Sequence, residues 1–411
     1  MDTLLQVLTK RPIAYITRDI ERALGMPIPT PGYFIITNKT KSSEEIRLSS
    51  PETIFTVSTS DGLTLDTYDI LVLPETKDIL SAHGIGDIVV FQNTTRIERW
   101  AAENNITILN PKADLAKRVE EKVSQIEWLA EDANLLPHHQ VLPLKDIAWD
   151  GVPFVLQFNR SHTGQGTHII TDESVLKELQ GKFPDRPVRV VVFVSGPMIT
   201  VNTLVSHNET FIGNPSLQIT GVKPFTDLPF ATVGNDWSFA HTLGNELHEQ
   251  LTTISKTIGS RLARSGWKGL FGIDAIIDTQ SQKMYLIEIN ARQPASTVFE
   301  STLERETGSS GITIFAAHLL ALLDTPITQN IIAPINGAQI VQRVTNAFPN
   351  NSNTTPLVNT LKMSGLTVLP YENIVHNRDA IRIQSQAGLM ETSTELNTQG
   401  LLIRDILQSN V

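Results

Sequence analysis

The chain has 411 residues, 40% of them hydrophobic. This length is too great for a single hydrophobic core, so we expect two or three domains. Its formal net charge of −10 argues against a nucleic-acid partner held by phosphate neutralisation. The absence of cysteine excludes disulfides, thiolate metal sites and a catalytic thiol. The N-terminal segment is charged throughout and no uncharged apolar run is long enough to span a bilayer, so we expect a cytoplasmic protein without a membrane partner.

Residues 31–111 alternate short apolar runs with polar segments. We predict a helix over 93–104 and strands over 32–37, 53–58, 69–74, 87–92 and 106–111. This alternation is typical of a small, mostly parallel, Rossmann-like sheet with helices on its faces. The segment has no G-x-G-x-x-G, so nothing marks it as a dinucleotide site, and we expect a structural or substrate-holding domain over 1–112.

The segment that follows, up to Pro137, has apolar side chains at helical spacing and is predicted to form one long helix. Its apolar face consists of Leu115, Val119, Val123, Ile126 and Leu129. Lys122 lies beside that face and could reach a phosphate, although a single helical lysine is usually just solvated.

A glycine-containing loop, 159–167, connects predicted strands over 153–158 and 168–170. Because a strand rather than a helix follows the loop, it is not a Walker loop, and we interpret it as a hairpin flap. Its backbone N–H groups could hold phosphate oxygens at Gly164 and Gly166, with hydroxyls from Thr163 and Thr167. Many hairpins have glycine turns without any ligand.

Further along the chain we predict a buried strand over 188–194, an irregular cleft-lining stretch over 220–237 and a long amphipathic helix over 243–262. An apolar helix over 311–323 follows. Strands over 337–344, 366–370 and 380–385 and a helix over 401–407 then suggest a small mixed α/β domain over 326–411.

Two apolar runs, 270–277 and 284–291, flank the polar segment DTQSQK and predict a β-hairpin. If the hairpin is symmetric about Ser281, Asp274 lies directly opposite Glu288. On the second strand Glu288, Asn290 and Arg292 share one face, and Ile287, Ile289 and Ala291 are predicted to face the core.

Opposed carboxylates about 4 Å apart would repel each other by roughly 4 kcal/mol at an effective dielectric near 20. Three arrangements could compensate this repulsion. One carboxyl could hold a proton, Arg292 could pair with one of them, or a divalent cation could bridge both with the Asn290 carbonyl as a third ligand. A solvent-facing strand with a local salt bridge is the simpler interpretation of E-x-N-x-R, but the opposed aspartate favours a metal.

Taken in order, these pieces resemble the ATP-grasp family of ligases over roughly residues 110–325. The resemblance rests on EKVSQIEWLAED, FVLQFNRSHTGQGT, VVVFVSGP, the long helix, and GIDAIID with YLIEINARQ. It implies an α/β and α+β multidomain fold in three parts. These are an N-terminal α/β domain (1–112), an ATP-grasp domain (113–325) and a small mixed C-terminal domain (326–411).

The resemblance also implies roles for residues of the hairpin. Asp274, Glu288 and Asn290 match the family's Mg²⁺ ligands, with Mn²⁺ as an alternative ion. Arg292 matches a catalytic position that contacts the transferred phosphoryl group or the acyl phosphate in many members.

For the nucleotide, Lys122 matches the first phosphate lysine, and the flap residues 164–167 match the segment that covers the β- and γ-phosphates. Residues 191–194, with Val192 and Val194, match the strand that offers backbone hydrogen bonds to adenine. Two positions depart from the family pattern. Gln157 stands where a second phosphate lysine is usual, and Val191 or Val192 stands where a carboxylate or glutamine often meets the nucleoside.

The implied function is an ATP- and Mg²⁺-dependent ligase that activates a carboxylate as an acyl phosphate and joins it to an amine, on an amino-acid-like substrate. The partners are then small-molecule carboxylates and amines, and the chain could form a homodimer. The alternatives are a carboxylase using carboxyphosphate, a phosphotransferase, and a nucleotide-binding regulatory protein without turnover. The last follows if Gln157 marks a lost contact; otherwise Arg160 or another basic residue replaces the missing lysine.

Overall fold

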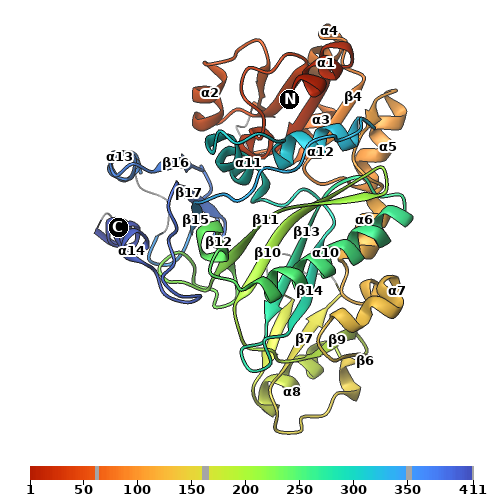
Figure 1. The fold of residues 1–411 in the computed structure, drawn as a ribbon, viewed down its shortest axis with the longest axis vertical. Helices are drawn as coiled ribbons and strands as arrows, with labels where there is room; N and C mark the ends of the chain where they lie inside the picture. The colour runs from red at the N-terminus through yellow and green to blue at the C-terminus, as the bar shows by residue number, and fades with distance from the viewer. Residues whose placement is uncertain (61–63, 160–165, 349–353, 410–411) are drawn as a thin grey trace.

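Figure 1 shows the computed structural model, which describes residues 1–60, 64–159, 166–348 and 354–409. Three sheets organise these residues: a five-stranded sheet near the N-terminus, a four-stranded sheet and an eight-stranded sheet. The large sheet occupies the middle of the view, and the two smaller sheets lie toward opposite ends of the long axis (Figure 1). The predicted α/β and α+β class is confirmed.

The N-terminal sheet was predicted to be mostly parallel, and all of its strand pairs are parallel. Its order is β3 (Ile54–Val57), β2 (Tyr33–Asn38), β1 (Ile13–Thr17), β4 (Asp87–Val90) and β5 (Thr107–Ile108). The helices of this region are α1 (Asp2–Lys10), α2 (Lys41–Arg47), α3 (Thr67–Val72), α4 (Pro74–Ala82) and α5 (Thr95–Glu103), with a 3₁₀ turn η1 (Ile20–Ala23).

The prediction of a strand over 69–74 is wrong, because these residues form α3 and the start of α4. The Asp66 side chain accepts a hydrogen bond from the N–H of Asp69 and caps α3, and Pro74 takes the first position of α4, where a missing N–H costs nothing. The central strand β1 precedes the first predicted strand and completes the sheet.

The four-stranded sheet is antiparallel, in the order β6 (His139–Pro143), β9 (Pro187–Val192), β7 (Phe154–Phe158) and β8 (Thr167–Ile170). Helix α8 (Glu173–Lys182) packs against it through Leu176. Two 3₁₀ turns, η2 (Ala130–Leu135) and η3 (Leu144–Asp146), flank β6.

The predicted single helix before Pro137 is wrong, because it is broken into α6 (Ala113–Glu120) and α7 (Ser124–Leu129). Glu121 is extended, with ψ at 129°. The break is held by Asn159 at the end of β7. Its backbone oxygen accepts from the N–H of Lys122 at 3.3 Å and its side-chain oxygen from the N–H of Val123 at 2.9 Å.

The eight-stranded sheet is antiparallel and carries the predicted hairpin at one edge. Its order is β14 (Met284–Asn290), β13 (Gly269–Ile277), β10 (Met198–Ser206), β11 (Glu209–Thr220), β12 (Thr232–Asp236), β15 (Ala338–Arg343), β17 (Asp379–Ser385) and β16 (Thr367–Pro370). The last three strands come from the predicted C-terminal domain and continue this sheet through the β12–β15 pairing. Where the chain divides into domains stays a prediction.

Helix α10 (Asn245–Arg264) packs one apolar face on the large sheet, using Leu251, Ile254, Ile258 and Leu262. Helices α11 (Thr297–Glu306) and α12 (Ile314–Leu322) lie between this sheet and the N-terminal sheet (Figure 1). The remaining helices are α9 (Trp237–Ala240), α13 (Thr355–Met363) and α14 (Thr398–Ser409). No helix in the described residues combines the length and apolarity needed to cross a membrane.

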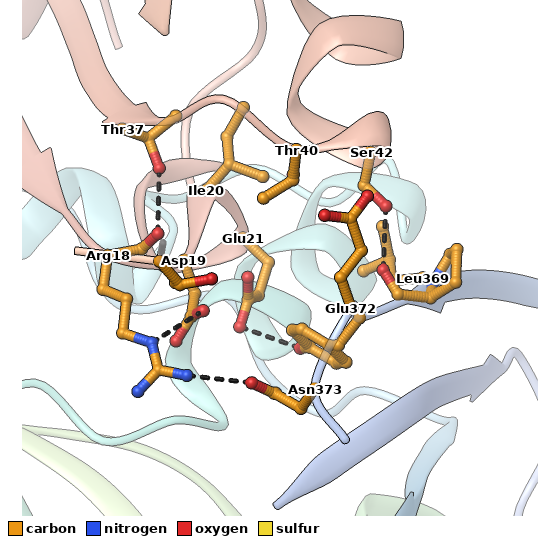
Figure 2. Close-up of a pocket in the computed structure, with 13 residues that line it drawn as sticks. Arg18, Asp19, Ile20, Glu21, Thr37, Thr40, Ser42, Leu369, Glu372 and Asn373 are labelled. Carbon is orange, nitrogen blue, oxygen red and sulfur yellow. Dashed lines mark hydrogen bonds and ion pairs between the residues drawn. The ribbon is translucent and has the colours of Figure 1, made fainter. Parts of the chain in front are cut away.

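The region of the N-terminal sheet also contacts the far end of the large sheet, beside β16 (Figure 2). Tyr371 donates its hydroxyl to Glu21 at 2.8 Å, and Arg18 donates to the Asn373 side-chain oxygen at 3.0 Å. These contacts surround a small pocket of about 40 Å³ and link segments more than 300 residues apart in the sequence.

Two buried carboxyl groups, neither in an ion pair with a described residue, hold α11 against the sheet. Glu300 accepts hydrogen bonds from the Asn202 side chain and from the N–H of Asn214, and Glu304 accepts from the N–H of Ile314. Burial raises the pKa of Glu300 to about 7, although the hydrogen bonds to Asn214 and Asn202 act against this shift. Burial, followed by the charge of Glu300, raises the pKa of Glu304 well above its usual value.

Because folded Glu300 keeps its proton to a higher pH than the unfolded chain, it destabilises the fold progressively between pH 4.5 and about 7. The variant E300Q removes this titration. The difference in free energy of unfolding, E300Q minus wild type, should therefore be about 2–3 kcal/mol more positive at about pH 8 than at about pH 5. Urea unfolding at several pH values measures the shift. The exposed neighbour on the same helix, E306Q, is the control, and an equal shift in both variants would contradict the assignment.

Candidate active site

A large cleft, about 1040 Å³ in volume, separates the four-stranded sheet from the hairpin edge of the eight-stranded sheet. Its walls come from β7 and β9 on one side and from β13 and β14 on the other, with the α6–α7 break at its side. Residues of β11, β12 and β15 and of segment 393–394 extend it. All the described candidate site residues except Gly166 line this cleft: Lys122, Gln157, Thr167, Val192, Val194, Asp274, Glu288, Asn290 and Arg292.

The predicted register of the hairpin is confirmed, because Asp274 pairs with Glu288. A β-bulge follows immediately, so that Ala275 pairs with Leu286 and Ile287 has no partner across the strands. The bulge reverses the alternation of side chains. The prediction that Ile287 enters the core is therefore wrong: Leu286 is buried instead, and Ile287 lines the cleft.

The two carboxylates are compensated unequally. Lys122 forms an ion pair with Glu288, with 2.8 Å between Nζ and Oε1. Desolvation alone would raise the pKa of Glu288, but the ammonium of Lys122 holds it below its ordinary value. Among the described residues, the hydrogen-bond donors to Asp274 are neutral: the Thr200 hydroxyl at 2.6 Å and the Asn290 amide at 3.0 Å. Burial and the charge of Glu288 raise the pKa of Asp274 to about 6.

Arg292 does not pair with either carboxylate of the hairpin. Its guanidinium forms an ion pair with Glu120 at the end of α6 and donates to the Asn290 side-chain oxygen at 3.0 Å. The carbonyl predicted to bind a metal is therefore hydrogen-bonded to Arg292, while the Asn290 amide nitrogen faces Asp274.

The donor set fits a hard divalent cation. The carboxylates of Asp274 and Glu288 are oxygen ligands of the kind that Mg²⁺ accepts together with water and phosphate oxygens, and the Asn290 oxygen could join them if its side chain turned away from Arg292. No group of three or more His, Asp or Glu side chains with metal-site geometry occurs in the described part of the chain. A metal at the hairpin would therefore have few protein ligands, as is usual for Mg²⁺ bound with a polyphosphate.

On the opposite wall, Gln157 on β7 pairs with Arg189 on the neighbouring strand β9, and both residues line the cleft. Arg189 donates to the side-chain oxygens of Gln157 at 2.8 Å and Gln125 at 2.9 Å. Burial lowers the pKa of this guanidinium to about 10. Arg189 is not among the residues predicted from the sequence, although a single arginine inside the apolar run VRVVVFV is a visible signal.

The flap is described only in part, because Arg160, Thr163 and Gly164 lie outside the described residues. Gly166 accepts a hydrogen bond from the N–H of Phe158 at 2.9 Å, and Thr167 begins β8 opposite Gln157.

Val192 ends β9 and is 49% exposed, and Val194 follows it in the loop at the cleft. The N–H of Val192 donates to the His138 carbonyl at 3.0 Å, so this donor is already used in the absence of a nucleobase.

Arg343 on β15 is a second lining residue that the sequence analysis does not name as functional. Its Nη2 donates to the Thr232 carbonyl at 2.9 Å, while Nε and Nη1 are buried and find no hydrogen-bond partner among the described residues. Gln218, Thr232 and Thr394 line the same part of the cleft. This part can accept an anionic group.

No protein-family model matches the chain, and no curated protein matches it in sequence. Solved structures match it in fold. N5-carboxyaminoimidazole synthase from Aspergillus clavatus, in complex with ADP and 5-aminoimidazole ribonucleotide, is 15% identical with a TM-score of 0.66, over 97% of this chain and 99% of that one.

The corresponding synthetase from Staphylococcus aureus, complexed with ADP, is 10% identical with a TM-score of 0.63, over 97% of both chains. Pyruvate carboxylase from Rhizobium etli is 13% identical with a TM-score of 0.61, and the match covers 92% of this chain but 36% of that one. These neighbours are ATP-grasp proteins, and likenesses at such low identity establish the fold. The chain therefore has the ATP-grasp fold, which confirms the resemblance seen in its motifs.

Proposed function

We propose that the chain is an ATP- and Mg²⁺-dependent ligase that activates a carboxylate as an acyl phosphate and joins it to an amine. One observation carries the proposal: the carboxylates of Asp274 and Glu288 oppose each other in a large cleft that also holds the cations Lys122 and Arg189. Opposed carboxylates suit a divalent cation, and fixed cations nearby suit the polyphosphate that such a cation accompanies.

In the first step an oxygen of the substrate carboxylate attacks the γ-phosphorus of ATP, the bond from that phosphorus to the β,γ-bridging oxygen breaks, and ADP leaves. Asp274, Glu288 and Asn290 would hold Mg²⁺, which supplies charge neutralisation at the phosphoryl oxygens when bound. Lys122 would bind phosphate oxygens from the side of the α6–α7 break.

In the second step the amine nitrogen attacks the acyl carbon. The bond from that carbon to the phosphate oxygen then breaks, and the nitrogen loses a proton as inorganic phosphate leaves. Arg292, two positions beyond Asn290, would stabilise the oxyanion of the tetrahedral intermediate, and this requires it to leave its contact with Glu120. The flap would close over the nucleotide and exclude the water that hydrolyses an acyl phosphate.

The substrate end of the cleft is proposed to lie at β15. Two buried guanidinium nitrogens of Arg343 have no partner there among the described residues, and a guanidinium binds carboxylate or phosphate oxygens well. An amino-acid-like substrate with an anionic group fits this end.

A second candidate is the carboxylase alternative, in which bicarbonate is the activated carboxylate and carboxyphosphate the intermediate. The fold neighbours named as N5-carboxyaminoimidazole synthases and pyruvate carboxylase favour it. The two candidates are distinguished by the compound that stimulates release of ADP: bicarbonate for the carboxylase and an amino acid for the ligase.

Replacing either hairpin carboxylate, in D274N or E288Q, should lower the rate of release of ADP and phosphate at least about 100-fold. The reason is that the variant binds the cation poorly, so the charge on the phosphoryl oxygens is no longer neutralised. The release is measured with Mg-ATP and a panel of carboxylates, amines and bicarbonate. D278N, at the exposed turn of the same hairpin and outside the cleft, should keep full turnover. Tight Mg-ATP binding by the wild type with no turnover on any panel member would instead favour a regulatory protein.

Removing the Arg343 guanidinium, in R343M, should raise the KM for the substrate carboxylate about 10-fold or more and leave the ADP dissociation constant within about twofold. Steady-state kinetics and ADP titration give the two values. R378M removes an exposed arginine directly before β17, the strand next to β15, and serves as the matched control. A loss of ADP affinity equal to the change in KM would place Arg343 at the nucleotide rather than at the substrate.

A further inference from the structure

Arg189 connects the two walls of the cleft. It belongs to β9 of the four-stranded sheet, and its Nη2 donates to the carbonyl of Ile287 on β14 of the large sheet at 3.3 Å. The bulge at Ile287 turns this carbonyl out of the regular strand pairing, next to Glu288. The guanidinium is therefore held beside the proposed metal site, and only 2% of the residue is exposed.

All three hydrogen-bond partners of Arg189 are neutral. They are the side-chain oxygens of Gln157 and Gln125 and the Ile287 carbonyl. No carboxylate in the described residues lies within 4.0 Å of its guanidinium. Glu288, the nearest charge of opposite sign, is already paired with Lys122. A buried charge without a counter-ion is costly, and burial lowers the pKa of Arg189 accordingly.

The neutral partners orient the guanidinium without neutralising it. A guanidinium has five N–H donors, and the three hydrogen bonds use one donor on each nitrogen, which leaves two. Gln157 accepts the Nε–H, so the residue at the position of the usual phosphate lysine acts here as a support for the arginine. A divalent cation at the hairpin would add positive charge and increase the demand for an anion.

We propose that Arg189 binds the terminal phosphates of the nucleotide, so that this chain carries its second phosphate cation on β9 instead of on β7. The proposal rests on the nucleotide-binding function argued above and assigns a residue to it. A di- or triphosphate supplies the missing negative charge, and its oxygens match the free donors of the fork. The departure at Gln157 is then a relocation of charge and not its loss.

The test measures dissociation constants for Mg-ADP and for adenosine in the full chain. The variant R189Q should bind ADP about 10- to 100-fold more weakly and adenosine within about twofold of wild type, because adenosine has no phosphate. The double variant Q157K/R189Q returns one cation to β7 and should recover most of the ADP affinity. R186Q removes an exposed arginine just before β9 and should bind both ligands like wild type.

Each outcome decides the question. Equal ADP affinity in R189Q and wild type overturns the proposal, and so does an equal loss of ADP and adenosine affinity, which would indicate a structural role. If R189Q does not fold, R189K and the double variant give the answer. Both keep one cation, and both should bind ADP more tightly than adenosine. A folded R189K that binds ADP no more tightly than adenosine overturns the proposal. If wild type itself does not bind ADP, the proposed function fails, which is a different result from R189Q binding as wild type does.

Discussion

The site depends on the opposition of two carboxylates across the β13–β14 hairpin. Paired strands place Asp274 and Glu288 on the same face at the same level, and this arrangement is unfavourable unless a cation lies between or beside them. In the described structure the Lys122 ammonium supplies that charge, at 2.8 Å from Glu288. At an effective dielectric near 20, attraction at such a distance is about 6 kcal/mol before desolvation, enough to offset a repulsion of roughly 4 kcal/mol.

This compensation explains why the helix after Pro111 has to break. A lysine on a continuous helix would lie on its surface, where it is usually solvated. The extended residue Glu121 and the two hydrogen bonds to Asn159 instead place Lys122 against the hairpin, 6% exposed. The end of β7 and the carboxylate of β14 are thereby joined through one side chain, so the geometry of the flap strand and that of the proposed metal site are coupled.

Strand parity alone predicts the Asp274–Glu288 pair, because a period of two leaves few alternatives for an alternating run with a short turn. The same parity misplaces Ile287, because a bulge adds a residue without any signal in the apolar pattern. The apolar spacing from Leu115 to Leu129 continues across the helix break, so periodicity cannot detect it, and the tertiary bonds to Asn159 decide the outcome. Arg189 could have been noticed as a charge within a buried strand, but its contact with Gln157 depends on strand pairing that the sequence does not reveal.

The two cations of the cleft come from different walls and are held in different ways. Lys122 is paired with Glu288, and in the proposed function it would exchange that carboxylate for a phosphate when a metal binds Glu288. Arg189 has no carboxylate partner within the described part of the chain, and its amide and carbonyl partners leave its charge intact. Binding of a metal–nucleotide complex would therefore break one ion pair and satisfy one unpaired charge. If the proposals for Lys122 and Arg189 hold, this charge pattern would favour binding of the metal and the polyphosphate together.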